Sequence, residues 1–168
     1  MSHYSCAQKL YRLKRFAEYS AAKIARNIKG EDDYQYALVY SGMSGIALAT
    51  AVSLELLTAY NVLIDMIYVR KQGETSHGDS IETSIDLETK NLRLIFIDDF
   101  IESGKTLAYV LDRVNHWRVF WGHGSSYSMP FLMPSLLVLE CYEGGFAIVP
   151  TRYRKIDNLL KKHANRLR

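Results

Sequence analysis

The chain has 168 residues, of which 48% are hydrophobic and 23% are charged, and this composition excludes an intrinsically disordered protein. Ten glycines and three prolines exclude a collagen-like or low-complexity chain. A net charge of +3 is too small to require a polyanionic partner, so we expect no nucleic-acid partner, whereas a small phosphate ester remains compatible with it.

Predicted helices and strands alternate along the chain. Residues 7–29 form an amphipathic helix, because apolar residues such as Leu10, Leu13 and Ala17 recur at spacings of three and four. The next elements are a strand at 36–40, a helix at 46–59, strands at 61–69, 81–85 and 92–97, a helix from 105, strands at 136–141 and 146–149, and a basic helix from 153. Residues 117–134 show no regular period. The alternation favours an α/β fold with a parallel sheet, which binds ligands beyond the carboxyl ends of its strands.

No linker or internal repeat divides the chain, and its length is sufficient to bury one core, so we expect a single domain over residues 1–168. Cys6 and Cys141 form neither a disulfide framework nor a metal-binding pair, which favours a reducing, cytoplasmic location. The N-terminus is charged where a signal peptide needs an apolar run, and no stretch approaches about 18 uninterrupted apolar residues, so we expect no membrane span.

The strongest chemical pattern is IFIDDFIESGKTL, which begins in the strand at 92–97. An apolar strand delivers two carboxylates, Asp98 and Asp99, to its carboxyl end, where burial in the sheet would otherwise be costly. Ser103, Gly104 and Thr106 then lead into a helix, and hydroxyls, backbone N–H groups and the positive end of the helix dipole together make a phosphate cradle.

Two other interpretations of this pattern are less satisfactory. A nucleotide-binding P-loop would require a glycine five residues before Gly104, and that residue is Asp99, whose carboxylate would repel the phosphates. Turn and helix capping would explain one acid and one hydroxyl, but not two successive acids followed by a glycine-containing loop.

The pattern resembles the signature of the type I phosphoribosyltransferases, which is an apolar strand, two acids, two apolar residues and a loop ending Thr/Ser-Gly-x-Thr. In that family the acids hold the ribose hydroxyls of phosphoribosyl pyrophosphate and the loop holds its 5-phosphate. The resemblance implies that Asp98 and Asp99 bind the ribose. The residues it assigns to the phosphate are Glu102, Ser103, Gly104, Lys105 and Thr106.

Two earlier loops are similar to other parts of the family's site. Ser41, Gly42 and Met43 lie where the family has its pyrophosphate-binding loop, although glycines at a strand-to-helix turn often serve steric needs alone. Arg70 and Lys71 begin a polar, glycine-containing segment that resembles the family's mobile loop, and its cations would stabilise the departing pyrophosphate. An ordinary solvated hairpin tip is the alternative for this segment.

The resemblance implies an α/β fold in which a parallel sheet is flanked by helices, with a core over about residues 30–150 and a small hood built from the terminal segments. It also implies that Mg²⁺ is bound through phosphoribosyl pyrophosphate and water near Asp98 and Asp99, without direct protein ligands. The expected substrates are phosphoribosyl pyrophosphate and a nucleobase, the expected assembly is a homodimer, and the expected function is nucleotide salvage. The alternative is a regulatory protein of the same fold that binds phosphoribosyl pyrophosphate or a nucleotide and has little transferase activity.

Two residues bear on the choice of base. Glu102 is similar to the aspartate with which the hypoxanthine-guanine branch contacts the purine, so we expect it to be catalytic together with Arg70 and Lys71, although an acid at a helix start is also stabilised by the dipole. Leu139 stands where that branch has a lysine that reads the 6-oxo group. A purine is favoured, but its 6-oxo group would need another partner. The basic C-terminal segment is interpreted as a solvated face, with RNA or an acidic partner as the alternative.

Overall fold

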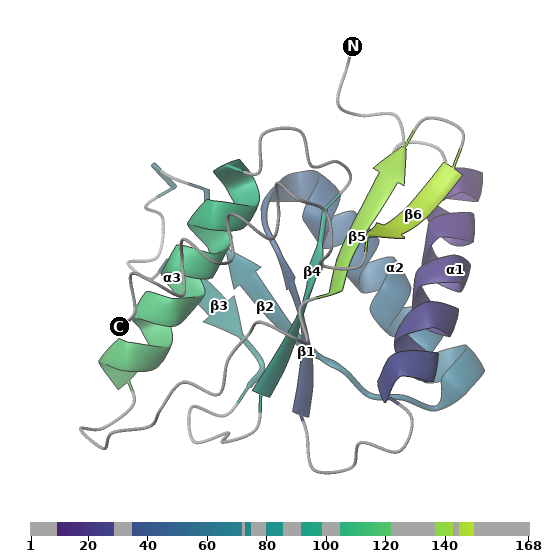
Figure 1. Cartoon of the computed structure of the whole chain (residues 1–168), viewed down its shortest axis with the longest axis horizontal. Helices are drawn as coiled ribbons and strands as arrows, with labels where there is room; N and C mark the ends of the chain where they lie inside the picture. Colours follow the sequence, from purple (N-terminus) through teal and green to yellow (C-terminus); the bar gives the residue numbers. More distant parts are fainter. Residues whose placement is uncertain are drawn as a thin grey trace.

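The computed structural model describes residues 10–28, 35–71, 73–74, 80–85, 92–98, 105–121, 137–142 and 145–149. These residues form three helices and six strands (Figure 1). The elements are α1 (Leu10–Ile28), β1 (Gln35–Tyr40), α2 (Gly42–Tyr60), β2 (Asp65–Val69), β3 (Ile81–Thr83), β4 (Leu92–Ile97), α3 (Lys105–Trp121), β5 (Leu137–Tyr142) and β6 (Gly145–Val149).

The six strands make one sheet in the order β3-β2-β1-β4-β5-β6. The four central strands are parallel, whereas β3 and β6 run antiparallel along the two edges. The sequence predicts a parallel sheet, and this holds for its centre only. The edges differ because β3 and β6 follow the preceding strands after only 11 and 2 residues, which is fewer than a crossover to a parallel strand needs.

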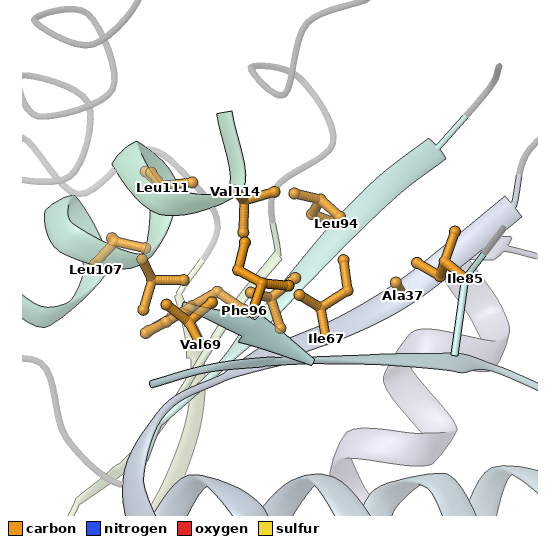
Figure 2. Close-up of a cluster of buried hydrophobic side chains, with 12 residues drawn as sticks. Ala37, Ile67, Val69, Ile85, Leu94, Phe96, Leu107, Leu111 and Val114 are labelled. Carbon is orange, nitrogen blue, oxygen red and sulfur yellow. The ribbon is translucent and has the colours of Figure 1, made fainter. Parts of the chain in front are cut away.

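Helices cover both faces of the described sheet (Figure 1). On one face, α1 and α2 share a buried cluster with Leu38 and Tyr40 of β1 and Ile95 of β4. On the other, Leu107, Leu111 and Val114 of α3 pack against sheet residues that alternate with the first set (Figure 2). Those sheet residues are Ala37, Val39, Ile67, Val69, Leu94 and Phe96. Successive side chains of each central strand are therefore buried in two apolar layers in turn, one on each face, as a parallel sheet requires.

Element boundaries differ from the predicted ones at two informative places. Helix α2 begins at Gly42 rather than at residue 46, so the stretch predicted as a glycine-containing loop is already the first turn of the helix. Strand β2 begins at Asp65 rather than at residue 61, because Asn61 has left-handed backbone angles (φ 54°) and ends α2. The N–H of Asn61 donates to Leu57 O and that of Val62 donates to Leu56 O, which satisfies carbonyls at the end of the helix.

Helix α3 runs to Trp121, into a segment for which no regular structure is predicted. The predicted C-terminal helix lies outside the described residues, as do the other segments assigned to the hood, except α1. That helix packs against α2 and contributes Phe16 and Ile24 to the core beside the sheet.

Helix α2 is long and apolar enough to cross a membrane, by length and composition alone. It also lies against α1 and the sheet, and its buried residues include Leu48, Val52 and Leu56. Packing against α1 and the sheet thus explains the apolar residues on the buried faces of α2, since a helix beneath another helix needs apolar residues around much of its circumference.

The position of α1 in the core predicts unequal costs for two truncations on that helix. Phe16 is 1% exposed whereas Leu10 is 81% exposed. Phe16→Ala should lower the free energy of unfolding by about 3–5 kcal/mol, because it leaves a cavity between α1 and the sheet. Leu10→Ala should change it by less than about 0.5 kcal/mol. Urea unfolding followed by circular dichroism measures both, and equal losses would show that α1 does not belong to the core.

Candidate functional site

Three loops meet at one edge of the sheet. Strands β2, β1 and β4 are adjacent and parallel, so their carboxyl ends, followed by Arg70, Ser41 and Asp98, lie at the same edge. Val39 pairs with Phe96, and this register brings Ser41 level with Asp98. After β1 the chain enters α2 on one face, and after β4 it enters α3 on the other. A point where the connections diverge in this way is the usual ligand site of an α/β sheet.

The loop after β1 consists of only one residue before the helix. Ser41 is the N-cap of α2, is buried and makes no side-chain capping hydrogen bond. Gly42 follows with φ +69°, and the exposed Met43 lies in the first turn. The first backbone N–H groups of a helix have no partner within it, and the helix dipole makes this end positive. The predicted pyrophosphate loop is therefore, in structure, a helix N-terminus suited to an anion.

Lys71 lies directly beside this helix N-terminus. A Cβ added to Gly42 would be 2.5 Å from Cε of Lys71 and 3.0 Å from its Nζ. The left-handed φ of Gly42 already favours glycine, and the Lys71 side chain occupies the space that a larger residue would need. The structure thus brings two of the predicted loops together, and places an exposed ammonium at the positive end of α2.

Arg70 is located differently from Lys71. It is 7% exposed, and its guanidinium forms an ion pair with Glu82 of β3. The backbone N–H of Arg70 donates to the backbone carbonyl of Ser80 at 3.0 Å. Tyr68 pairs with Glu82 in the register of β2 and β3, so Arg70, two residues later, lies diagonally across from Glu82. The sequence predicts Arg70 and Lys71 as two cations on one mobile segment, but the Arg70 guanidinium is held against the sheet edge.

A turn follows Lys71 and is fastened by Glu74. The N–H of Glu74 donates to Lys71 O at 3.0 Å, and Gly73, the third residue of this four-residue turn, has φ +94°, which favours glycine. Oε2 of Glu74 accepts hydrogen bonds from Tyr68 Oη and from the N–H of Lys71, both at 3.1 Å. Neither Tyr68 nor Glu74 is predicted as a site residue, because nothing in the sequence indicates that a strand tyrosine and a loop acid meet.

Tyr68 remains a hydrogen-bond donor at neutral pH. Burial raises the pKa of its phenol above the ordinary value of 10, and the hydrogen bond to the Glu74 carboxylate and its negative charge raise the pKa further. The ring of Tyr68 lies 5.7 Å from that of Tyr40, whose pKa is also raised by burial. The phenol therefore stays protonated and donates its hydrogen bond to Glu74 throughout the physiological pH range.

The third loop is described only at its two ends. Asp98 follows β4 and is 8% exposed, and α3 begins at Lys105, where Lys105 and Thr106 are exposed. Asp99, Glu102, Ser103 and Gly104 lie outside the described residues. In the described part of the chain, no group of three or more histidine, cysteine, aspartate or glutamate side chains is arranged to hold a metal ion.

Comparison with known proteins gives information at the level of structure. No protein-family model matches the chain, and no curated protein matches it. Among solved structures, it is similar to the orotate phosphoribosyltransferase of Francisella tularensis, with 18% sequence identity and a TM-score of 0.54. That match covers 92% of this chain and 65% of the other. The fold is that of the type I phosphoribosyltransferases.

A weaker likeness is found to the hypoxanthine phosphoribosyltransferase of Trypanosoma cruzi in complex with IMP. It has 13% identity and a TM-score of 0.47, and it covers 76% of this chain and 64% of the other. The chain thus spans slightly less than two thirds of the length of either of these two proteins.

The contact between Gly42 and Lys71 predicts different effects for one substitution at two glycines. Asparagine tolerates left-handed backbone angles better than other non-glycine residues, so Gly42→Asn and Gly73→Asn carry similar, small conformational costs. Only at Gly42 does the new side chain meet Lys71, since nothing lies within 4 Å of a Cβ at Gly73. Gly42→Asn should weaken the binding of inorganic pyrophosphate about tenfold, equivalent to about 1.4 kcal/mol.

Isothermal titration calorimetry with inorganic pyrophosphate measures this difference. Gly73→Asn should stay within about twofold of the unmodified chain, since it leaves both the helix N-terminus and Lys71 in place. Equal losses in the two variants would mean that the proximity of Gly42 to Lys71 is irrelevant to the anion.

Proposed function

We propose that the protein is a phosphoribosyltransferase that transfers ribose 5-phosphate from phosphoribosyl pyrophosphate to a nucleobase and releases pyrophosphate. The observation that carries this proposal is the convergence of the α2 N-terminus, Lys71 and Asp98 at the switch point of a type I phosphoribosyltransferase fold. The signature IFIDDFIESGKTL in the loop after β4 supports it.

The pyrophosphate group is assigned to the α2 N-terminus. In the reaction, the bond from C1 of the sugar to the pyrophosphate oxygen breaks, and a bond from C1 to a ring nitrogen of the base forms. Negative charge grows on the leaving group in an oxocarbenium-like transition state. The backbone N–H groups after Ser41 and the ammonium of Lys71 are oriented before this charge develops, which is the arrangement that stabilises it most.

The sugar phosphate is assigned to the loop between β4 and α3. Asp98 and Asp99 would accept hydrogen bonds from the ribose hydroxyls, and Glu102 to Thr106 would enclose the 5-phosphate. Support for the second assignment comes from α3, which begins at Lys105 and directs its positive end toward this loop. Holding both substrates at one sheet edge supplies rate acceleration through proximity.

The described residues fit a magnesium ion that is bound mainly through substrate. Mg²⁺ in nucleotide enzymes is held by one or two carboxylates together with substrate phosphates and waters, rather than by a complete set of protein ligands. Asp98 at the end of β4 and Asp99, the next residue, would lie near the ion and hold it through its waters and the ribose, without binding it directly. When bound, Mg²⁺ would neutralise charge on the pyrophosphate.

We propose a purine as the accepting base, with Glu102 contacting it. Leu139 pairs with Ile97 in the register of β4 and β5, so it lies one residue from the level of Asp98. A leucine cannot donate a hydrogen bond to a 6-oxo group. A backbone group or another residue of the hood must therefore complete recognition of the base.

Regulatory binding of phosphoribosyl pyrophosphate without turnover is the second candidate, and one observation favours it. The guanidinium of Arg70 is paired with Glu82. Of the two adjacent cations Arg70 and Lys71, it is therefore Lys71 that lies beside the α2 N-terminus. A sensor needs fewer charges on the leaving group than an enzyme does. Measuring pyrophosphate release over a panel of purines, orotate and uracil separates the two, since a sensor binds phosphoribosyl pyrophosphate and releases nothing.

The acidic pair provides a test that is independent of the base. The double variant Asp98→Asn, Asp99→Asn should bind phosphoribosyl pyrophosphate at least tenfold more weakly and lose most of its turnover, because neutral amides hold the metal-bound ribose less well. Asp112→Asn is the matched control, since Asp112 is an exposed acid of α3. A double variant that unfolds, while its folded fraction binds normally, would assign the pair a structural role instead.

The assignment of Glu102 predicts a loss in the chemical step. Glu102→Gln should lower kcat with a purine by at least tenfold and change the affinity for phosphoribosyl pyrophosphate by less than about twofold, because it removes a general base and keeps the backbone N–H groups that would hold the 5-phosphate. Steady-state kinetics and calorimetry measure the two effects separately. Unchanged turnover with purines, or activity with orotate or uracil alone, would eliminate the purine.

A further inference from the structure

One carboxylate oxygen connects the end of β2 to the turn that follows it. Oε2 of Glu74 accepts from Tyr68 Oη, in the strand, and from the backbone N–H of Lys71, in the turn. The N–H of Glu74 donates in return to the carbonyl of Lys71. Glu74 thus holds both backbone polar groups of Lys71, the N–H and the C=O.

These hydrogen bonds fix the backbone position from which the Lys71 side chain extends. The side chain of lysine has four rotatable bonds, and fixing its backbone greatly reduces the region that the ammonium can reach. Here it reaches back across the sheet edge until Cε lies 2.5 Å from the position of a Gly42 Cβ. In the part of the chain that the structure describes, no ion pair holds this ammonium, so its position depends on the backbone from which it extends.

The charge of Glu74 alone would be a disadvantage here. A carboxylate near a pyrophosphate site repels the anion, and the repulsion is larger where water is partly excluded. The geometry gives Glu74 another use, because its oxygen accepts from two donors while the carboxylate remains exposed to water. The residue before Lys71 is fixed too, because Arg70 pairs with Glu82 and its backbone N–H donates to the carbonyl of Ser80.

We propose that Glu74 is a positioning residue, which holds the backbone of Lys71 so that the Lys71 ammonium stays at the N-terminus of α2, where the pyrophosphate is assigned. The inference rests on the proposed function, since it assigns a role within the same site. Glu74 does not contact the substrate. It acts through hydrogen-bond acceptance and not through its charge, and an uncharged acceptor of the same shape should replace it.

Three single variants test this role in the full chain. Glu74→Ala removes the acceptor and the charge, Glu74→Gln removes only the charge, and Lys71→Ala removes the ammonium. Glu74→Ala should weaken the binding of inorganic pyrophosphate about tenfold by calorimetry, whereas Glu74→Gln should remain within about twofold or bind more tightly. In turnover, Glu74→Ala should lower kcat more than it raises KM, because the charge that Lys71 neutralises is largest in the transition state.

The double variant Glu74→Ala, Lys71→Ala distinguishes positioning from a direct effect. If Glu74 acts through Lys71, the double variant binds pyrophosphate as weakly as Lys71→Ala alone, with no further loss. Glu18→Ala, which removes an exposed glutamate of α1 that pairs with Lys14, is the control for a nonspecific loss of negative charge. Thermal unfolding of every variant identifies any loss that is due to stability.

The outcomes separate the two proposals. If the unmodified chain binds neither pyrophosphate nor phosphoribosyl pyrophosphate, the proposed function fails, and this inference fails with it. If it binds them and Glu74→Ala binds equally well, only the positioning role fails. Equal effects of Glu74→Ala and Glu74→Gln would show that the charge matters and not the hydrogen bonds. Additive losses in the double variant would show that Glu74 acts independently of Lys71.

Discussion

The parallel pairing of β1 with both β2 and β4 is the constraint on which the site depends. Val39 of β1 is level with Ile67 on one side and with Phe96 on the other. Because all three strands run in the same direction, the residues that leave the sheet after them lie at one edge. Residues from three separate segments thereby meet around the carboxyl end of β1.

The alternation of side chains along these strands maintains that pairing. Leu38 and Tyr40 face the layer of α1 and α2, and Ala37 and Val39 face the layer of α3. A shift of the register by one residue would turn each apolar set toward the wrong layer, so burial on both faces fixes the register. The positions of Ser41 and Asp98 at the sheet edge are consequences of core packing, and their chemistry is added to a scaffold that burial already specifies.

The order of the elements and the site loops after β1 and β4 could be predicted from the sequence, because apolar strands ending in polar, glycine-containing stretches are local signals. The alternating residues 81–85 after a polar segment also indicate a return strand, and β3 does pair antiparallel with β2. The antiparallel direction of β6 could not be predicted, because it depends on how the chain returns after β5. The sequence places Gly42 in a loop, whereas α2 begins at Gly42 in the structure, and the left-handed φ of this residue has no signal in the sequence. The connection from Tyr68 through Glu74 to Lys71 has no sequence signal at all, because three ordinary residues acquire their relation from the turn.

The two adjacent cations after β2 show why residue type alone does not assign a role. Arg70 and Lys71 are equivalent in the sequence as positive charges at a strand end. The planar guanidinium of Arg70 is suited to burial against Glu82 and forms an ion pair there, which ties the end of β2 to β3. The compact ammonium of Lys71 is more strongly hydrated and stays exposed, on a stem long enough to reach Gly42. Exchanging the two residues would place the bulkier, branched head beside the α2 N-terminus and leave Glu82 facing a side chain with no fork of donors. The difference between them is therefore that Arg70 ties two strands together at the sheet edge, whereas Lys71 places one positive charge beside the first turn of α2.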